Sequence, residues 1–183
     1  MLQIDIPELE LYDQNKGEFI TIKAQKLQLE HSLLSLSKWE SKWCKPFLSS
    51  DDKTVEQTID YIRCMTIGPP ASPEVYTQIA YNEEIIKQIK AYIDAPMTAT
   101  WFHEKEGAKK KSKEIVTAEL IYYWMIALQI PFECEKWHLN KLLTLVKVCN
   151  IKNTPTKKMP KKEIYSRNKA LNEARRAKYN TKG

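Results

Sequence analysis

The sequence predicts an α+β protein that is predominantly helical. Three observations support this fold class. Apolar residues recur every three or four positions over several stretches, which is typical of helices with one buried face. Two polar loops, at 13–17 and 103–112, lie between short runs rich in β-branched and aromatic residues, which indicates two β-hairpins. A basic segment with few apolar residues ends the sequence and predicts a helix outside the core.

The N-terminal region predicts the first hairpin. Residues 9–12 and 19–22 flank a polar loop that ends in Gly17, a residue suited to a tight turn. Residues 27–31 alternate between apolar and polar and are compatible with a third strand. From about Ser32 the spacing becomes helical, with Leu33, Leu36, Trp39 and Trp43 on one face, and Pro46 ends this helix.

Three helices are expected in the middle of the sequence. Thr54 and Gln57 fit a capping box, in which two side chains bond the free amides at a helix start. The prolines and glycine of residues 68–73 break the chain, and Pro73 can occupy the first position of a short helix. Asn82 is a good cap for a third helix over residues 83–93.

The second hairpin is expected near 98–117, with its lysine-rich loop exposed. Residues 120–128 are apolar on nearly every side, which predicts a central helix buried all round, with Trp124 near the middle of the core. Pro131 then interrupts the chain, and residues 137–149 continue as a last core helix.

The charge distribution predicts two parts. Residues 1–149 hold 18 Lys/Arg and 21 Asp/Glu, whereas residues 150–183 hold 11 Lys/Arg and two acids, a net charge of +9. We therefore expect one globular domain over 1–149 and, over 150–183, a basic linker followed by a helix from Pro160 to about Tyr179. That helix has too few apolar residues to form a core, so we expect it to act through a partner.

Composition disfavours several functional classes. Four glycines in 183 residues leave no P-loop and no dinucleotide-binding glycine motif. The longest apolar stretch, 120–132, is shorter than the ~20 residues of a membrane helix. The first residues lack the basic start and apolar run of a secretory signal, so we expect an intracellular protein.

Cysteine and histidine offer the main candidates for chemistry. In a reducing compartment we expect four buried thiols, at Cys44, Cys64, Cys134 and Cys149. Cys134, His138 and Cys149 could ligate a metal, but they lack a paired C-x-x-C and lie on a predicted core helix, so a structural role is favoured. His31 could activate Cys44 or Cys64, but no known signature surrounds either thiol.

Acidic pairs occur at Asp51–Asp52 and Glu83–Glu84. Such pairs can serve acid–base catalysis, but both lie at predicted helix starts, where carboxylates stabilise the helix dipole. We therefore predict no enzyme, with no catalytic, cofactor-binding or metal-binding residues.

The best candidates for a binding site are basic and aromatic side chains. The basic tail could bind an acidic protein, contact nucleic acid phosphates, or be merely solvated. Tryptophans can anchor protein interfaces, although most of the five are expected in the core. The predicted partner-binding residues are Lys157, Lys158, Lys161, Lys162, Arg167, Arg175, Arg176, Trp39 and Trp43.

Several segments of the sequence are similar to small proteins of tailed bacteriophages. The similar segments are 29–43 (LEHSLLSLSKWESKW), 60–65 (DYIRCM), 95–101 (APMTATW), 121–140 (IYYWMIALQIPFECEKWHLN), 166–176 (SRNKALNEARR) and 180–183 (NTKG). Together they are distributed along nearly the whole chain, and the group that they resemble is that of tail assembly chaperones.

This resemblance implies a non-enzymatic role in the host cytoplasm. A tail assembly chaperone is encoded between the major tail protein and the tape measure protein. It would bind the tape measure protein, present it to tail-tube subunits and leave before the virion matures. The resemblance implies no cofactor, and self-association stays open. The alternative is a structural virion protein, such as a head–tail connector or inner core component, whose basic tail contacts DNA.

Overall fold

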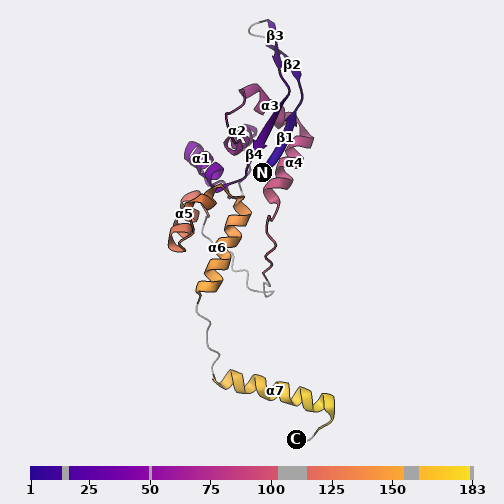
Figure 1. Cartoon of the computed structure of the whole chain (residues 1–183), viewed down its shortest axis with the longest axis vertical. Coiled ribbons are helices and arrows are strands. Elements are labelled where there is room, and N and C mark those ends of the chain that lie inside the picture. The colour runs from indigo at the N-terminus through magenta and orange to yellow at the C-terminus, as the bar shows by residue number, and fades with distance from the viewer. Residues whose placement is uncertain (14–16, 50, 103–114, 155–160, 182–183) are drawn as a thin grey trace. The chain divides into compact units, whose positions relative to one another are not determined.

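A computed structural model describes residues 1–13, 17–49, 51–102, 115–154 and 161–181. Within these ranges the fold is α+β and mostly helical, as predicted (Figure 1). The chain forms two compact units, Met1–Asn150 and Ile151–Gly183. No helix within the described ranges has both the length and the apolar character needed to cross a membrane.

The N-terminal region forms one long antiparallel ribbon of four strands. These are β1 (Leu2–Ile6), β2 (Leu9–Asp13), β3 (Glu18–Ile22) and β4 (Gln25–Leu29), with β1 paired to β4 and β2 paired to β3. Ile6 lies opposite Gln25 and Leu9 opposite Ile22, so both pairs share one register. Pro7 lies between the pairs, where it has no amide proton to give to a ladder.

The predicted first hairpin is therefore confirmed as β2 and β3. The expected third strand is also present, shifted to Gln25–Leu29, and its partner β1 was not predicted. Buried residues alternate with exposed ones along β1 and β4, so the inner half of the ribbon packs one face against the helices. In contrast, β2 and β3 extend beyond the helices as a two-stranded arm (Figure 1).

Four helices follow the ribbon, and their starts agree with the sequence. They are α1 (Leu33–Trp43), α2 (Val55–Met65), α3 (Pro73–Tyr81) and α4 (Glu83–Asp94). Thr54 and Gln57 form the predicted capping box of α2, and the Asn82 side chain accepts bonds from the amides of Glu84 and Ile85. Local capping thus sets the starts of α2 and α4, because it satisfies amides that lack partners within the helix. The start of α3 has no side-chain cap and is set by Pro73 in its first turn.

The remaining helices are α5 (Ala118–Ala127), the short 3₁₀ helix η1 (Phe132–Lys136), α6 (Leu139–Asn153) and α7 (Lys161–Tyr179). Two apolar clusters form the core of Met1–Asn150. The ribbon packs with α2, α3 and α4 around the first cluster, which contains Trp39 and Tyr76. The start of α1 packs with α5 and α6 around the second cluster, which contains Leu36 and Ile121.

A buried carboxylate joins these two regions. Glu40 of α1 accepts hydrogen bonds of 2.7 Å from the backbone amides of Phe47 and Ala118. Because Ala118 is the first residue of α5, this carboxylate satisfies a helix-terminal amide and lies near the positive end of the helix dipole. One side chain thus fixes the start of α5 relative to α1.

The prediction of a second hairpin is wrong over the described residues. Residues 98–102 and 115–117 form no strand, and the predicted loop residues 103–114 lie outside the described residues. Thr117 instead caps α5, its side chain accepting from the amide of Leu120. The β-branched residues that suggested a strand therefore belong to an extended connection and a helix cap.

The prediction for α5 is also wrong. Its buried residues are Ala118, Ile121 and Met125, and they occupy one face. Tyr123 and Ile126 are each 63% exposed, and Trp124 is only partly buried. An apolar sequence did not force burial on all sides, because only one neighbouring layer packs against this helix.

Candidate functional site

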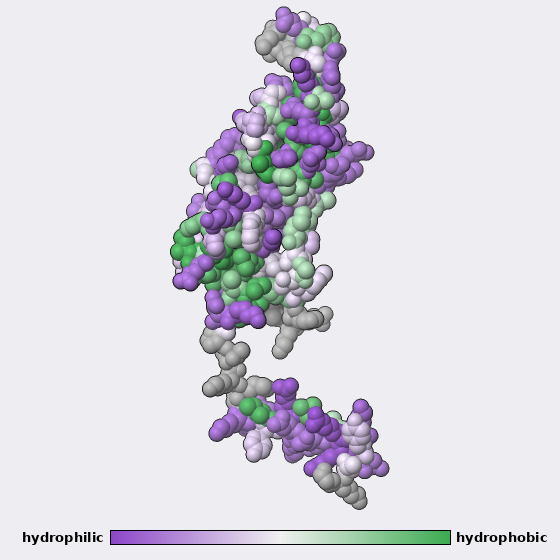
Figure 2. All heavy atoms as spheres, viewed as in Figure 1, coloured by the Kyte–Doolittle hydropathy of each residue, from purple (hydrophilic) through white to green (hydrophobic). Residues whose placement is uncertain are grey.

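The outward side of α5 is a candidate apolar binding surface. We define the α5 apolar face as Tyr122, Tyr123, Ile126 and Phe132. Tyr123 and Ile126 point away from the buried residues of the helix, and Phe132 of η1 is 55% exposed. The rings of Tyr122 and Phe132 lie 6.4 Å apart, which links η1 to α5. Figure 2 shows hydrophobic residues gathered over α5 and the neighbouring α6.

One polar contact holds this face in place. The hydroxyl of Tyr122 donates a hydrogen bond of 2.8 Å to Glu135. Desolvation, with this bond and the negative charge of Glu135, raises the pKa of Tyr122 above its usual value. The phenol therefore stays protonated as a donor. The resulting surface is apolar and aromatic, and its composition suits protein binding rather than catalysis.

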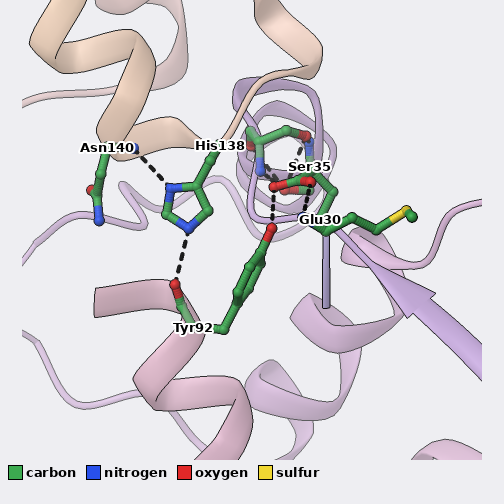
Figure 3. Close-up of polar contacts among 7 residues, drawn as sticks. Glu30, Ser35, Tyr92, His138 and Asn140 are labelled. Atoms are coloured by element: carbon green, nitrogen blue, oxygen red, sulfur yellow. Dashed lines mark hydrogen bonds and ion pairs between the residues drawn. The ribbon is translucent and has the colours of Figure 1, made fainter. Parts of the chain in front are cut away.

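A second candidate lies where the ribbon, α1, α4 and α6 meet (Figure 3). The backbone amide of Asn140 donates to Nδ1 of His138, so Nε2 carries the proton and donates to the carbonyl oxygen of Tyr92 at 2.9 Å. The hydroxyl of Tyr92 donates to Glu30 at 2.6 Å. The Asn140 side chain donates to the carbonyls of Ile93 and Ala95.

His31 completes this buried polar cluster. A hydrogen bond of 2.6 Å joins its Nδ1 to the hydroxyl of Tyr61, and its ring lies 5.2 Å from that of His138. Desolvation and the nearby His138 lower the pKa of His31 to about 4. Burial also raises the pKa of Tyr61. The imidazole is therefore neutral at pH 7 and the phenol protonated. Because Tyr61 belongs to α2, the cluster joins the end of the ribbon to α2, α4 and α6 as a structural network.

The structure does not bring the sequence candidates for nucleophilic catalysis together. Nδ1 of His31 is bonded to Tyr61 rather than to a thiol. Burial, followed by the charge of Asp60, raises the pKa of Cys64, and burial with Glu133 raises that of Cys134. Both thiols are therefore less reactive than free cysteine.

The expectation of four buried thiols is wrong for Cys44. This residue is exposed and ends α1 with a left-handed backbone, at φ 50°. Cys134 is buried, whereas Cys64 and Cys149 are half-buried.

Among the described residues, no group of three His, Cys, Asp or Glu side chains is placed to hold a metal ion. Of the two acidic pairs, Glu83 and Glu84 lie in the first turn of α4 as predicted, whereas Asp51 and Asp52 precede Thr54, the cap of α2, and lie outside that helix.

The predicted partner-binding residues fall into three groups. Lys161, Lys162, Arg167, Arg175 and Arg176 are exposed on α7, whereas Lys157 and Lys158 lie outside the described residues. Trp43 is half-buried, and its indole donates to Asp60 at 2.9 Å.

Trp39 must be reassigned from the surface to the core. It is 1% exposed, and its indole donates to the carbonyl of Gln57 at 2.9 Å. Its helical spacing could not reveal this, since both core and interface tryptophans occur at such positions.

Two features were missed by the sequence analysis. The first is a pocket of about 280 Å³ between α2 and α4, with Ile62, Ile86 and Ile89 among its lining residues and Lys53 and Lys90 also lining it. The second is an aromatic pair on the arm, Tyr12 and Phe19, with ring centroids 5.1 Å apart. The alternation within residues 9–22 could have indicated that these two rings share a face.

Comparisons with models of protein families, with curated proteins and with solved structures found no match to this chain. Its function must therefore be argued from its own residues.

Proposed function

We propose that this protein is a tail assembly chaperone of a tailed bacteriophage. In this role it binds the tape measure protein and tail-tube subunits in the host cytoplasm and takes no part in catalysis. The proposal starts from the resemblance of its sequence to such proteins. One structural observation carries the physical argument, namely that the α5 apolar face is exposed on a helix whose opposite side is fixed in the core.

The α5 apolar face suits a helical client. Tyr123 and Ile126 stand three positions apart on one side of α5, so they can pack along an apolar stripe of another helix. Aromatic side chains are also enriched among residues that dominate binding energy. A long helical protein with exposed apolar stripes, such as a tape measure protein, is therefore a fitting partner.

The basic helix α7 supports the alternative role. It buries no side chain, and residues 161–179 hold seven Lys/Arg and two acids. Such a helix can neutralise DNA phosphates, as a head–tail connector or inner core protein would require. It can equally bind acidic segments of a client protein, so the two roles must be separated by experiment.

The chaperone role is tested by co-expressing the chain with the tape measure protein of the same genome. Tyr123→Asp should reduce co-purification about tenfold or more, because it places a charge in the centre of the apolar contact. Tyr81→Asp is the matched control, since Tyr81 is also an exposed helical tyrosine but lies on α3. Equal recovery of both variants would contradict the proposed binding face.

The structural alternative is tested on virions. Mass spectrometry of gradient-purified particles should find little or none of the chaperone, because it leaves before maturation. Recovery at a fixed stoichiometric copy number would instead favour the connector or inner core role. Salt-sensitive DNA binding that requires α7 would favour it further.

A further inference from the structure

We propose that copies of this chain associate head to tail, with the β2–β3 arm of one copy inserted into the α2–α4 pocket of the next. The arm is defined as the described residues of β2 and β3 with their neighbours, 8–13 and 17–23. The pocket is the cavity between α2 and α4 lined by Phe47, Lys53, Ile62, Ile86, Ile89 and Lys90 among others. The proposal concerns the purified chain alone, so it does not depend on the tape measure protein.

The arm presents an aromatic pair without a covering layer. Tyr12 lies directly opposite Phe19 in the ladder, and the two side chains are 56% and 70% exposed. A two-stranded hairpin is marginally stable by itself in water, and large exposed aromatics gain free energy when they are buried. The arm therefore has both the shape and the side chains of an insertion element.

The pocket has a size and an apolar lining that suit such a side chain. Its volume of about 280 Å³ is slightly below the ~300–1,000 Å³ of typical small-molecule sites. An aromatic ring from a partner is therefore a better occupant than a drug-sized ligand. Ile86 and Ile93 line it while remaining only partly buried, so each retains apolar surface that an inserted ring would cover. The Phe47 ring is already stacked on Tyr61 and has Nζ of Lys53 4.5 Å from its centroid.

Complementary charge favours the arm as the occupant of the pocket. Lys53 and Lys90 line the pocket, no acidic residue does so among the described residues, and neither lysine forms an ion pair within the described ranges. In the sequence, residues 8–23 hold four acids, Glu8, Glu10, Asp13 and Glu18, against two lysines. The strand alternation places Glu10 on the same face as Tyr12, and Glu18 adjoins Phe19 in sequence.

The exposed aromatics of α7 fit the pocket less well than the arm does. The helix α7 exposes Tyr165, but its surplus of Lys/Arg would be repelled by the pocket lysines. None of the lining residues of the pocket comes from the arm, so the two surfaces are distinct. An interface between two different surfaces of identical chains is heterologous, and it produces a ring or an open series of copies.

Sedimentation velocity over a range of concentrations tests this arrangement. The wild-type chain should form species larger than a dimer as its concentration rises. Phe19→Ala removes the inserted ring, and Lys90→Glu reverses a charge of the pocket. Each variant alone should weaken self-association about tenfold or more.

The decisive measurement is an equimolar mixture of the two variants. Phe19→Ala keeps an intact pocket and Lys90→Glu keeps an intact arm. The arm of a Lys90→Glu copy can therefore enter the pocket of a Phe19→Ala copy, and no further copy can be added. The mixture should form heterodimers and nothing larger. Tyr165→Ala and Lys87→Glu are matched controls on α7 and on another position of α4, and both should assemble as the wild type does.

Three results would overturn the proposal. The first is a wild-type chain that stays monomeric at about 100 μM, a concentration that still populates weak complexes. The second is a wild-type dimer that does not grow further, since this indicates an isologous contact. The third is a mixture of the two variants that forms no heterodimer although circular dichroism shows both to be folded.

Discussion

The helices of Met1–Asn150 and the helix of Ile151–Gly183 differ in what stabilises them. Each helix from α1 to α5 buries one face against a neighbouring element, as does α6 over most of its length. Along its 19 residues, α7 buries no side chain. A helix without tertiary contacts depends on its local propensity alone and is marginal in water. Helices with the same backbone conformation can therefore differ widely in the free energy that stabilises them.

Charge separates the two regions in the same way. Residues 1–149 have a surplus of three acids, whereas the remainder carries a net charge of +9. In the first region, charged side chains take part in the fold, as the buried Glu40 shows. In α7 the basic side chains are all exposed and free to act on a partner.

The largest effect is expected from Trp39→Ala. Trp39 is buried and bonded to Gln57, so its truncation removes apolar contacts and leaves a cavity. We expect a loss of about 3–5 kcal/mol in the free energy of unfolding. Urea denaturation followed by circular dichroism measures this loss. The matched surface variant Tyr165→Ala on α7 should change stability by less than about 0.5 kcal/mol.

Acid should destabilise the first region through His31. Its folded-state pKa of about 4 lies below the ordinary 6.5, so the unfolded chain takes up the proton first as the pH falls. The contribution of neutral His31 to the free energy of unfolding is fully present above about pH 6.5. As the pH falls towards 4, the free energy of unfolding decreases progressively, by up to about 3 kcal/mol.

Denaturation between pH 7 and pH 4 measures this effect against His31→Asn. The variant should be less stable at pH 7 but should show a shallower decline with acid. An identical slope for both proteins would mean that His31 does not titrate in this window.

Trp124→Ala tests a helix that is intermediate between the two regions. Because Trp124 is only partly buried, its truncation should cost about 2 kcal/mol, less than that of Trp39. Thermal denaturation of the two variants side by side provides the comparison. A larger loss of stability than for Trp39→Ala would contradict the partial burial of Trp124 and would place α5 in the centre of the core.

The smallest effect on the first region is expected from deleting residues 151–183. Its free energy of unfolding should change by less than about 0.5 kcal/mol, because α7 buries no side chain. The difference in circular dichroism between the two chains reports the helicity of α7, which should fall on warming. A deletion that unfolds residues 1–150 would show Ile164 or Leu171 to be part of the core.

The sequence predicted the elements whose signals are local. Thr54 and Asn82 cap their helices as expected, since a capping side chain and the amides it bonds lie within three residues. The hairpin of β2 and β3 was predicted for the same reason. The basic helix was predicted from composition. Its predicted partner-binding residues, among them Lys161 and Arg175, are exposed, and the structure does not indicate what they bind.

Contacts between distant segments could not be predicted in this way. Strand β1 was missed because its partner β4 follows about 20 residues later, and no single window contains both. The sequence by itself determined where helices begin, where the charge gathers and which residues are apolar. Only the tertiary structure decided that Trp39 is buried and that Tyr123 and Phe19 are exposed, because burial depends on which surfaces the chain brings together.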